Sequence, residues 1–223
     1  MRSDIWILMP AFNEEESIGK VIEEVHRCYK NVIVVNDGSD DDTGEIAGQA
    51  GCVVLNHESN LGKGAAIKTG FGWLLEREYS AVITLDADGQ HDPAEILRFI
   101  ECFEKIKSDA VIIGNRSIER ESMPLYRAIP NRIGELFISI AARRHIPDTQ
   151  SGFRLYSRKV IEKVRCDSDG FEMEAEMLIR ASRGGFGIYS IPIRTIYQAN
   201  YSSHFRPVKD FYRISRIVLR HIL

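Results

Sequence analysis

The stretch Ile83-Thr84-Leu85-Asp86-Ala87-Asp88-Gly89-Gln90 joins the end of a β-forming run to two carboxylates. In an open α/β sheet, ligands bind at the carboxyl ends of the strands, so Asp86 and Asp88 are expected at that rim. Hard divalent cations prefer carboxylate oxygens and often bridge a protein to substrate phosphates. An Asp-x-Asp pair alone also suits an ordinary turn before a helix, and the rest of the chain decides between the two interpretations.

The first half of the chain alternates continuous apolar runs with amphipathic segments. Such apolar runs suit strands that are buried on both faces of a parallel sheet. The alternation predicts an α/β fold with a doubly wound, mostly parallel central sheet flanked by helices. The expected strands cover residues 5–9, 32–35, 52–55, 81–85 and 109–113, and the expected helices start at Glu14 and cover 43–49, 65–77 and 94–105.

The second half contains longer helical patterns. It predicts helices over 125–145 and 171–183, a strand that ends near Tyr156, and a last strand over 187–193. Residues 208–223 alternate apolar side chains with lysine and arginine, which is typical of a basic amphipathic helix. We expect a main domain over residues 1–195 and a basic tail with this C-terminal helix over 196–223.

Composition excludes several classes of protein. A net charge of −3 provides no general attraction to nucleic acid. Four cysteines without metal-type spacing indicate reduced thiols. The sequence shows no secretory segment and no run of the roughly 18–20 apolar residues that span a bilayer. A cytoplasmic protein, soluble or peripheral to a membrane, is therefore expected.

Acidic residues follow three of the predicted strands: Glu14 the first, Asp37 the second, and Asp86 and Asp88 the fourth. Carboxylates at one sheet edge repel each other unless a cation or a ligand compensates. Asp37 could accept hydrogen bonds from a base or a ribose, although an Asx turn is an equally good interpretation.

Basic residues supply the opposite charge. The Gly-rich loop Asn60-Leu61-Gly62-Lys63-Gly64 precedes a predicted helix and suits an anion, without matching the P-loop spacing. Arg116, Arg132 and Arg154 could neutralise phosphates, because a guanidinium group matches phosphate oxygens in pairs.

Four motifs in this order resemble the signatures of family 2 glycosyltransferases: Pro10-Ala11-Phe12-Asn13-Glu14-Glu15, Val35-Asn36-Asp37-Gly38-Ser39, Asn60–Gly64 and Asp86–Gln90. Ser151-Gly152-Phe153-Arg154-Leu155-Tyr156 is similar to the motif of the polyprenyl-phosphate sugar transferases of that family, the dolichol-phosphate mannosyltransferase group. The resemblance covers about residues 5–193.

This resemblance implies a GT-A fold, a GDP- or UDP-sugar donor and Mg2+ or Mn2+ as cofactor. The metal would be held by Asp86, Asp88 and Gln90, with Asp88 also catalytic. By motif match, the donor nucleotide would contact Pro10, Ala11, Phe12, Glu14, Val35, Asp37, Lys63, Asp86 and Ala87.

The acceptor side follows from the same resemblance. Arg116 and Arg132 match basic positions that face the transferred group and the acceptor phosphate, and Arg154, His204 and Arg206 are further phosphate candidates. The arginine and lysine typical of the mannosyltransferase tail are replaced here by Gln198 and His204, so mannose is not implied. The Gln-x-x-Arg-Trp motif of processive synthases is absent, which favours transfer of a single sugar.

The expected function is inverting transfer of one sugar to a polyprenyl phosphate, dolichyl or undecaprenyl. A lipid phosphate is already a nucleophilic anion, whereas a hydroxyl acceptor on a cell-surface glycan would need a general base, for which Asp148 is the candidate. A non-catalytic nucleotide-sugar-binding protein is a second alternative. A nucleotidyltransferase is disfavoured, because residues 10–13 lack the Gly-rich loop expected after its first strand.

The C-terminal helix leaves two interpretations open. Its basic face can meet anionic headgroups while its apolar face inserts, which would place the protein peripherally at the inner face of the cell membrane. Alternatively, the apolar face packs on the domain or on a second subunit.

Overall fold

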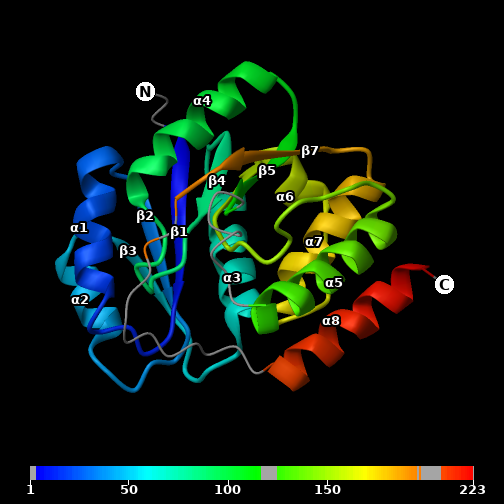
Figure 1. Cartoon of the computed structure of the whole chain (residues 1–223). Helices are drawn as coiled ribbons and strands as arrows, with labels where there is room; N and C mark the ends of the chain where they lie inside the picture. The colour runs from blue at the N-terminus through cyan, green and yellow to red at the C-terminus, as the bar shows by residue number, and fades with distance from the viewer. Residues whose placement is uncertain (1–3, 117–124, 195, 197–206, 223) are drawn as a thin grey trace.

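The structure, a computed structural model, describes residues 4–116, 125–194, 196 and 207–222. Within these residues, seven strands form one sheet in the order β3-β2-β1-β4-β6-β5-β7. Only β6 runs antiparallel to its described neighbours, β4 and β5, so the expected mostly parallel sheet is confirmed (Figure 1). The strands are β1 (Ile5–Ala11), β2 (Val32–Asn36), β3 (Val53–Asn56), β4 (Ala81–Thr84), β5 (Ala110–Asn115), β6 (Arg154–Ser157) and β7 (Gly187–Pro192).

Helices cover both faces of this sheet (Figure 1). One layer contains α1 (Ile18–Cys28), α2 (Thr43–Gln49) and α4 (Ile96–Ile106), which follows the 3-10 turn Pro93–Glu95. The other layer contains α3 (Lys63–Leu75), α5 (Leu125–Ala142), α6 (Arg158–Lys163), α7 (Glu172–Arg183) and α8 (Pro207–Ile222).

Strand β1 shows why the sheet needs both layers. Its side chains alternate between the faces, so Ile7 and Met9 join the core under α1 and α4 while Leu8 joins the core under α3. Gly70 lets α3 approach closely, because a Cβ there would lie 2.3 Å from Leu8 Cδ1. The sheet is therefore a buried platform whose strand ends form the accessible rim.

The expected element boundaries just after the first strand are wrong. Strand β1 does not stop at Met9 but continues through Pro10, which pairs in register with Val35 of β2. The first helix begins at Ile18 rather than at Glu14. The Glu14 N–H instead donates to Thr43 Oγ1 over 2.8 Å, so this segment is tied to the loop after β2.

Two features of the second half are not predicted by the sequence: the direction of one strand and the presence of one short helix. The strand containing Tyr156 enters the sheet antiparallel, between β4 and β5. It leads directly into the short helix α6, which the periodicity of the sequence does not reveal. A four-residue strand has too short a pattern to indicate its direction.

The expected C-terminal helix is confirmed as α8. It packs on α5 and α7, and Ile217 and Val218 are buried in that contact. Among the residues that the structure describes, none of the helices combines the length and the hydropathy that crossing a bilayer requires. The division of the chain at residue 195 stays a prediction.

Leu8→Ala should lower the free energy of unfolding by about 2–5 kcal/mol, because the side chain is fully buried against α3 and leaves a cavity. Urea denaturation followed by circular dichroism measures this loss. The control, Leu97→Ala on the exposed side of α4, should cost far less. Equal losses for the two variants would contradict the assignment of Leu8 to the core.

Candidate active site

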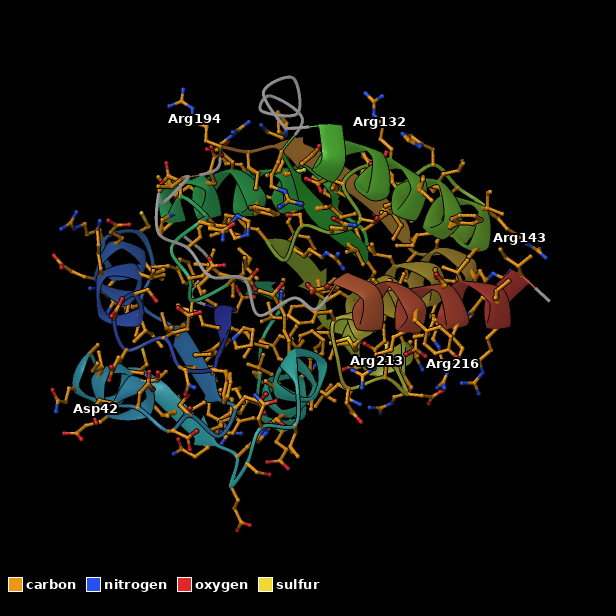
Figure 2. All side chains as sticks on the ribbon, turned by 60° about the horizontal axis from the view of Figure 1, so that its bottom comes forward. Asp42, Arg132, Arg143, Arg194, Arg213 and Arg216 are labelled. Carbon is orange, nitrogen blue, oxygen red and sulfur yellow. The ribbon has the colours of Figure 1, made fainter. Side chains whose placement is uncertain are left out.

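A cleft of about 1030 Å³ lies at the carboxyl ends of β1, β2 and β4. Its first wall consists of residues predicted to bind the donor: Pro10, Ala11, Phe12, Glu14, Asp37, Lys63, Asp86, Ala87 and Asp88. Its second wall consists of the segment 167–172 and of α8, from which Arg213 and Arg216 project on the same side (Figure 2). The volume lies at the upper end of small-molecule sites, which are typically about 300–1,000 Å³.

A buried ion cluster connects the strand end of β4 to α3 and α7. Lys63 Nζ lies 2.7 Å from Asp86 Oδ1 and 3.0 Å from Glu174 Oε2. The side chains of Lys63 and Glu174 are only 15% and 8% exposed. The main chain of Gly152 covers the cluster, because a Cβ there would lie 2.5 Å from Asp86 Oδ2.

Charges within the cluster stabilise one another. Burial alone would lower the pKa of Lys63, but the Asp86 and Glu174 carboxylates raise it above its ordinary value. Burial alone would raise the pKa of Asp86, but the Lys63 ammonium holds it below its ordinary value. At neutral pH the cluster therefore contains an ammonium group and an ionised Asp86.

The residues around Asp88 suit a hard divalent cation. Asp88 Oδ1 accepts a hydrogen bond from Gln90 N, which fixes the turn after β4. No three His, Cys, Asp or Glu side chains of the described residues form a ready-made metal cage. Mg2+ nevertheless often needs only one or two carboxylates, with phosphates and water as the other ligands. The oxygen donors of Asp86 and Asp88 on the cleft wall fit that chemistry.

His91 lies behind Asp86, with Nε2 3.9 Å from Asp86 Oδ2. Burial lowers the pKa of His91 to about 4, so the imidazole is neutral at neutral pH. Its Nδ1 is buried and has no hydrogen-bond partner among the residues that the structure describes. Its closeness to the metal candidates was missed from the sequence, where it is only the residue after Gln90.

Asp37 organises the Gly-rich loop. Its carboxylate accepts hydrogen bonds from the N–H groups of Leu61 and Gly62 over 3.0 and 2.8 Å. His57 Nδ1 lies 2.6 Å from Asp37 Oδ1. Both oxygens thus have partners inside the protein, and Asp37 contributes to the cleft by holding the loop in place.

Two further donor candidates differ in position. Glu14 lines the cleft and accepts a hydrogen bond from Ser17 Oγ over 2.6 Å, and the same hydroxyl donates to the Ala87 carbonyl. Val35 is fully buried in the core between the strands and does not line the cleft. The Val35 side chain is therefore not presented to the cleft, and a nucleotide contact at Val35 stays a prediction.

Arg116 and Asp148 form a bidentate ion pair. Arg116 Nε and Nη2 donate to the two Asp148 oxygens over 2.9 and 2.8 Å, and Arg116 N also donates to Oδ2. Asp148 is buried. Because both of its oxygens bind Arg116, the geometry does not fit the expected general base, and Asp148 instead positions the guanidinium group.

Of the remaining phosphate candidates, the one that the structure describes on α5 does not line the cleft. Arg132 is exposed on α5 and points outward (Figure 2). His204 and Arg206 lie outside the described residues. Among the acceptor-side arginines that the structure describes, Arg116 lies near the strand end of β4, where its charge adds to that of Lys63 in keeping the pKa of Asp86 low.

Arg154 has a structural position that contradicts the expected phosphate contact. It is fully buried, and its guanidinium group donates to the main-chain carbonyls of Thr149, Ser151 and Glu174, each over 2.7 Å. The group therefore connects the loop before β6 to α7. Arg154 thereby fixes the main chain of Glu174, whose side chain holds Lys63.

Glu174 is the main residue that the sequence interpretation missed. In the sequence it stands near the start of the predicted helix 171–183, where an acidic residue is ordinary. A usable signal was present, because Glu172, Glu174 and Glu176 alternate with apolar side chains that are buried all around α7. Acidic residues within a fully buried helix need a partner.

Comparison with solved structures identifies the class of fold. Glucosyl-3-phosphoglycerate synthase of Mycobacterium tuberculosis, solved with Mn2+, UDP and glucosyl-3-phosphoglycerate, superposes with a TM-score of 0.73 at 19% identity, covering 98% of this chain and 78% of that one. The same enzyme has also been solved with Mg2+ and UDP. The expected GT-A fold is confirmed.

This chain belongs to glycosyl transferase family 2, whose model matches residues 6–165. The polyprenol monophosphomannose synthase of Mycolicibacterium smegmatis is 30% identical over 84% of this chain and 75% of that protein. The UDP-N-acetylglucosamine–dolichyl-phosphate N-acetylglucosaminyltransferase of Methanococcus voltae is 29% identical over 98% of both. The protein is a glycosyltransferase, as the motifs predict.

Arg154→Met should lower the free energy of unfolding by about 3–5 kcal/mol, because it removes the donors of three carbonyls in a dry interior. Thermal and urea denaturation measure the loss, with the exposed Arg144→Met as control. A phosphate-binding Arg154 would instead give weaker substrate binding with unchanged stability, and that result would refute the structural role.

Proposed function

We propose that the protein transfers one sugar from a nucleoside-diphosphate sugar to a polyprenyl phosphate, with inversion at the anomeric carbon. The observation that carries this proposal is that both carboxylate oxygens of Asp148 already accept hydrogen bonds from the protein. Because both Asp148 oxygens bind Arg116, the geometry favours an acceptor that is already an anion over a hydroxyl that needs a base. The names of the two relatives, which specify polyprenol and dolichyl phosphate, support the same acceptor.

The donor occupies the first wall of the cleft in this proposal. The nucleoside lies along Pro10, Ala11 and Phe12, beside the loop that Asp37 holds. Lys63 begins α3, and the amino end of a helix attracts an anion such as a diphosphate. The cleft therefore carries a nucleoside wall and, next to it, a site for phosphate.

Asp86 and Asp88, with Gln90, would hold Mg2+ or Mn2+ against the diphosphate. The bound cation supplies charge neutralisation for the departing nucleoside diphosphate. Similar solved structures that contain Mn2+ or Mg2+ with UDP support this assignment. The role of the protein residues is to present the two carboxylates on one turn, fixed by the Gln90 N–H.

In this proposal, the guanidinium group of Arg116 binds the phosphate of the acceptor. Asp148 and the Arg116 main chain fix the guanidinium group near β4. An acceptor phosphate held there attacks the anomeric carbon in line, its oxygen forms the new glycosidic bond, and the bond to the nucleoside diphosphate breaks. Holding two anions in this orientation is a positioning effect, which supplies much of the rate without a proton transfer.

The test is a panel of GDP- and UDP-sugars with Mn2+ and a polyprenyl phosphate, scored for sugar-lipid product. Asp88→Ala should lower kcat/KM at least about a hundredfold, because it removes electrostatic stabilisation of the leaving group. Asp42→Ala is the matched control, since Asp42 is exposed and lies away from the cleft (Figure 2). Unchanged turnover by Asp88→Ala would refute the metal assignment, and product on a glycan hydroxyl alone would refute the acceptor.

The membrane contact in this proposal uses two adjacent helices. Exposed Ile133, Leu136, Phe137 and Ile140 form one stripe along α5. The neighbouring α8 exposes Tyr212, Leu219 and Ile222, and both views place the two helices side by side (Figures 1 and 2). Arg143 and Arg144 are exposed at the end of the α5 stripe.

Apolar side chains bordered by arginine suit an anionic membrane surface, at which the protein would lie peripherally on its cytoplasmic side. The arginines of α8 that were expected to meet headgroups instead line the cleft. Membrane contact by α8 therefore relies on its exposed apolar residues.

Paired substitution of Leu136 and Phe137 by Glu should weaken binding to anionic vesicles at least about tenfold, because two exposed apolar side chains no longer enter the bilayer. Vesicle co-sedimentation, with and without anionic lipid, measures the partition. Leu97→Glu on α4, another exposed leucine, is the control. Equal vesicle binding by the paired variant and the wild type would rule out this face as the membrane contact.

A further inference from the structure

Lys63 has an unusual position for a residue of a metal and diphosphate site. Its ammonium group lies 2.7 Å from the carboxylate oxygen Oδ1 of Asp86, which is one of the two proposed metal-binding aspartates. A divalent cation that uses Asp86 therefore has to share it with a positive charge that is already part of the protein.

The second partner, Glu174, holds Lys63 in this position. Glu174 Oε2 lies 3.0 Å from Lys63 Nζ, and the other oxygen of Glu174 is buried and finds no hydrogen-bond partner within the described part of the chain. The main chain of Glu174 is in turn fixed by the buried Arg154.

The backbone of Lys63 is equally constrained. Gly62 has a φ of 102°, and a Cβ at this position would lie 2.8 Å from the Asp169 carbonyl oxygen. The Ala65 N–H donates to that same carbonyl over 2.8 Å. The start of α3 cannot shift without breaking this contact, so neither end of the Lys63 side chain is loose.

The formal charges show what this arrangement achieves. Asp86, Asp88 and Glu174 together carry −3, and Lys63 reduces the sum to −2, which a divalent cation balances. Without a diphosphate, the ammonium group and the cation repel each other across Asp86. With a diphosphate on the cleft wall, both positive charges gain a common anionic partner.

We propose that Lys63, held by Glu174, is an internal counter-ion of Asp86 that makes binding of the divalent cation depend on the nucleoside diphosphate. This inference rests on the proposed donor site and extends it. Lys63 weakens binding of the cation alone and strengthens binding of the cation with the nucleotide. The two residues position charge, and Glu174 does so through Lys63.

The experiment measures Mn2+ binding by electron paramagnetic resonance, without nucleotide and with GDP or UDP, in the full chain. Wild-type protein should bind Mn2+ at least tenfold more tightly when one nucleotide is present. By linkage, Mn2+ should strengthen binding of that nucleotide by the same factor.

Two variants should change Mn2+ binding in opposite directions. Lys63→Met should tighten binding of Mn2+ alone about tenfold, and should reduce the effect of the nucleotide at least tenfold. Glu174→Gln removes one negative charge while Lys63 stays on Asp86, so it should weaken binding of Mn2+ alone several-fold. A merely structural role would weaken binding in both variants.

The matched control is Lys68→Met, which removes a lysine from the same helix. Lys68 pairs with Asp169 at 2.5 Å and does not line the cleft, so its loss should leave Mn2+ binding unchanged. If circular dichroism shows that Lys63→Met is unfolded, Lys63→Gln takes its place, because it also removes the charge but keeps a polar group between Asp86 and Glu174, and the same tighter binding of Mn2+ alone is expected.

Unchanged Mn2+ binding in Lys63→Met, or tighter binding in Glu174→Gln, overturns the inference. If the wild type binds no Mn2+ in the presence of GDP and none in the presence of UDP, the metal site of the proposed function itself is overturned. Sugar transfer is not needed for this measurement, so a failed acceptor assignment does not affect it.

Discussion

The carboxylates of Asp86, Asp88 and Glu174 gather where the sheet meets the cleft. The repulsion among them is the constraint that the site has to satisfy. Lys63 satisfies it from within the chain, by bridging Asp86 and Glu174. That bridge needs α3 to begin at one position, and needs α7 to face it. Two glycines allow main chain to pack closely here, Gly62 against the Asp169 carbonyl and Gly152 against the Asp86 carboxylate. The buried guanidinium group of Arg154 holds the main chain of Glu174 beside them.

Arg154 and Arg116 show how one residue type fulfils two tasks. Both are held by oxygen acceptors, but Arg154 donates to three main-chain carbonyls and the Tyr156 hydroxyl in the interior, whereas Arg116 binds a carboxylate near the rim. A guanidinium group without an anion beside it can be tolerated in a dry interior only when its donors are all directed at acceptors. Motif membership alone does not distinguish the two environments.

Much of the fold could be predicted from the sequence, because apolar runs and helical spacing report burial directly. The first-wall residues from Pro10 to Asp88 could be predicted for a related reason, since polar residues after parallel strands meet at one edge. The direction of β6 and the partners of Asp148, Arg154 and Glu174 could not. The decisive contacts join residues 20 or more positions apart, such as Arg116 with Asp148 or Arg154 with Glu174, and no local pattern encodes them.

The insertion of β6 also affects how the chain acquires its structure. Strands β4 and β5 do not pair with each other, and the segment that joins them in the sheet arrives some forty residues after β5 in sequence. Until Arg154–Ser157 is in place, both strands keep an open edge, and the turn carrying Asp86 lacks the Gly152 main chain that covers it. Insertion of β6 therefore joins the two parts of the sheet and covers the charged cluster together, and strand edges that are open before it favour aggregation of incompletely synthesised chains.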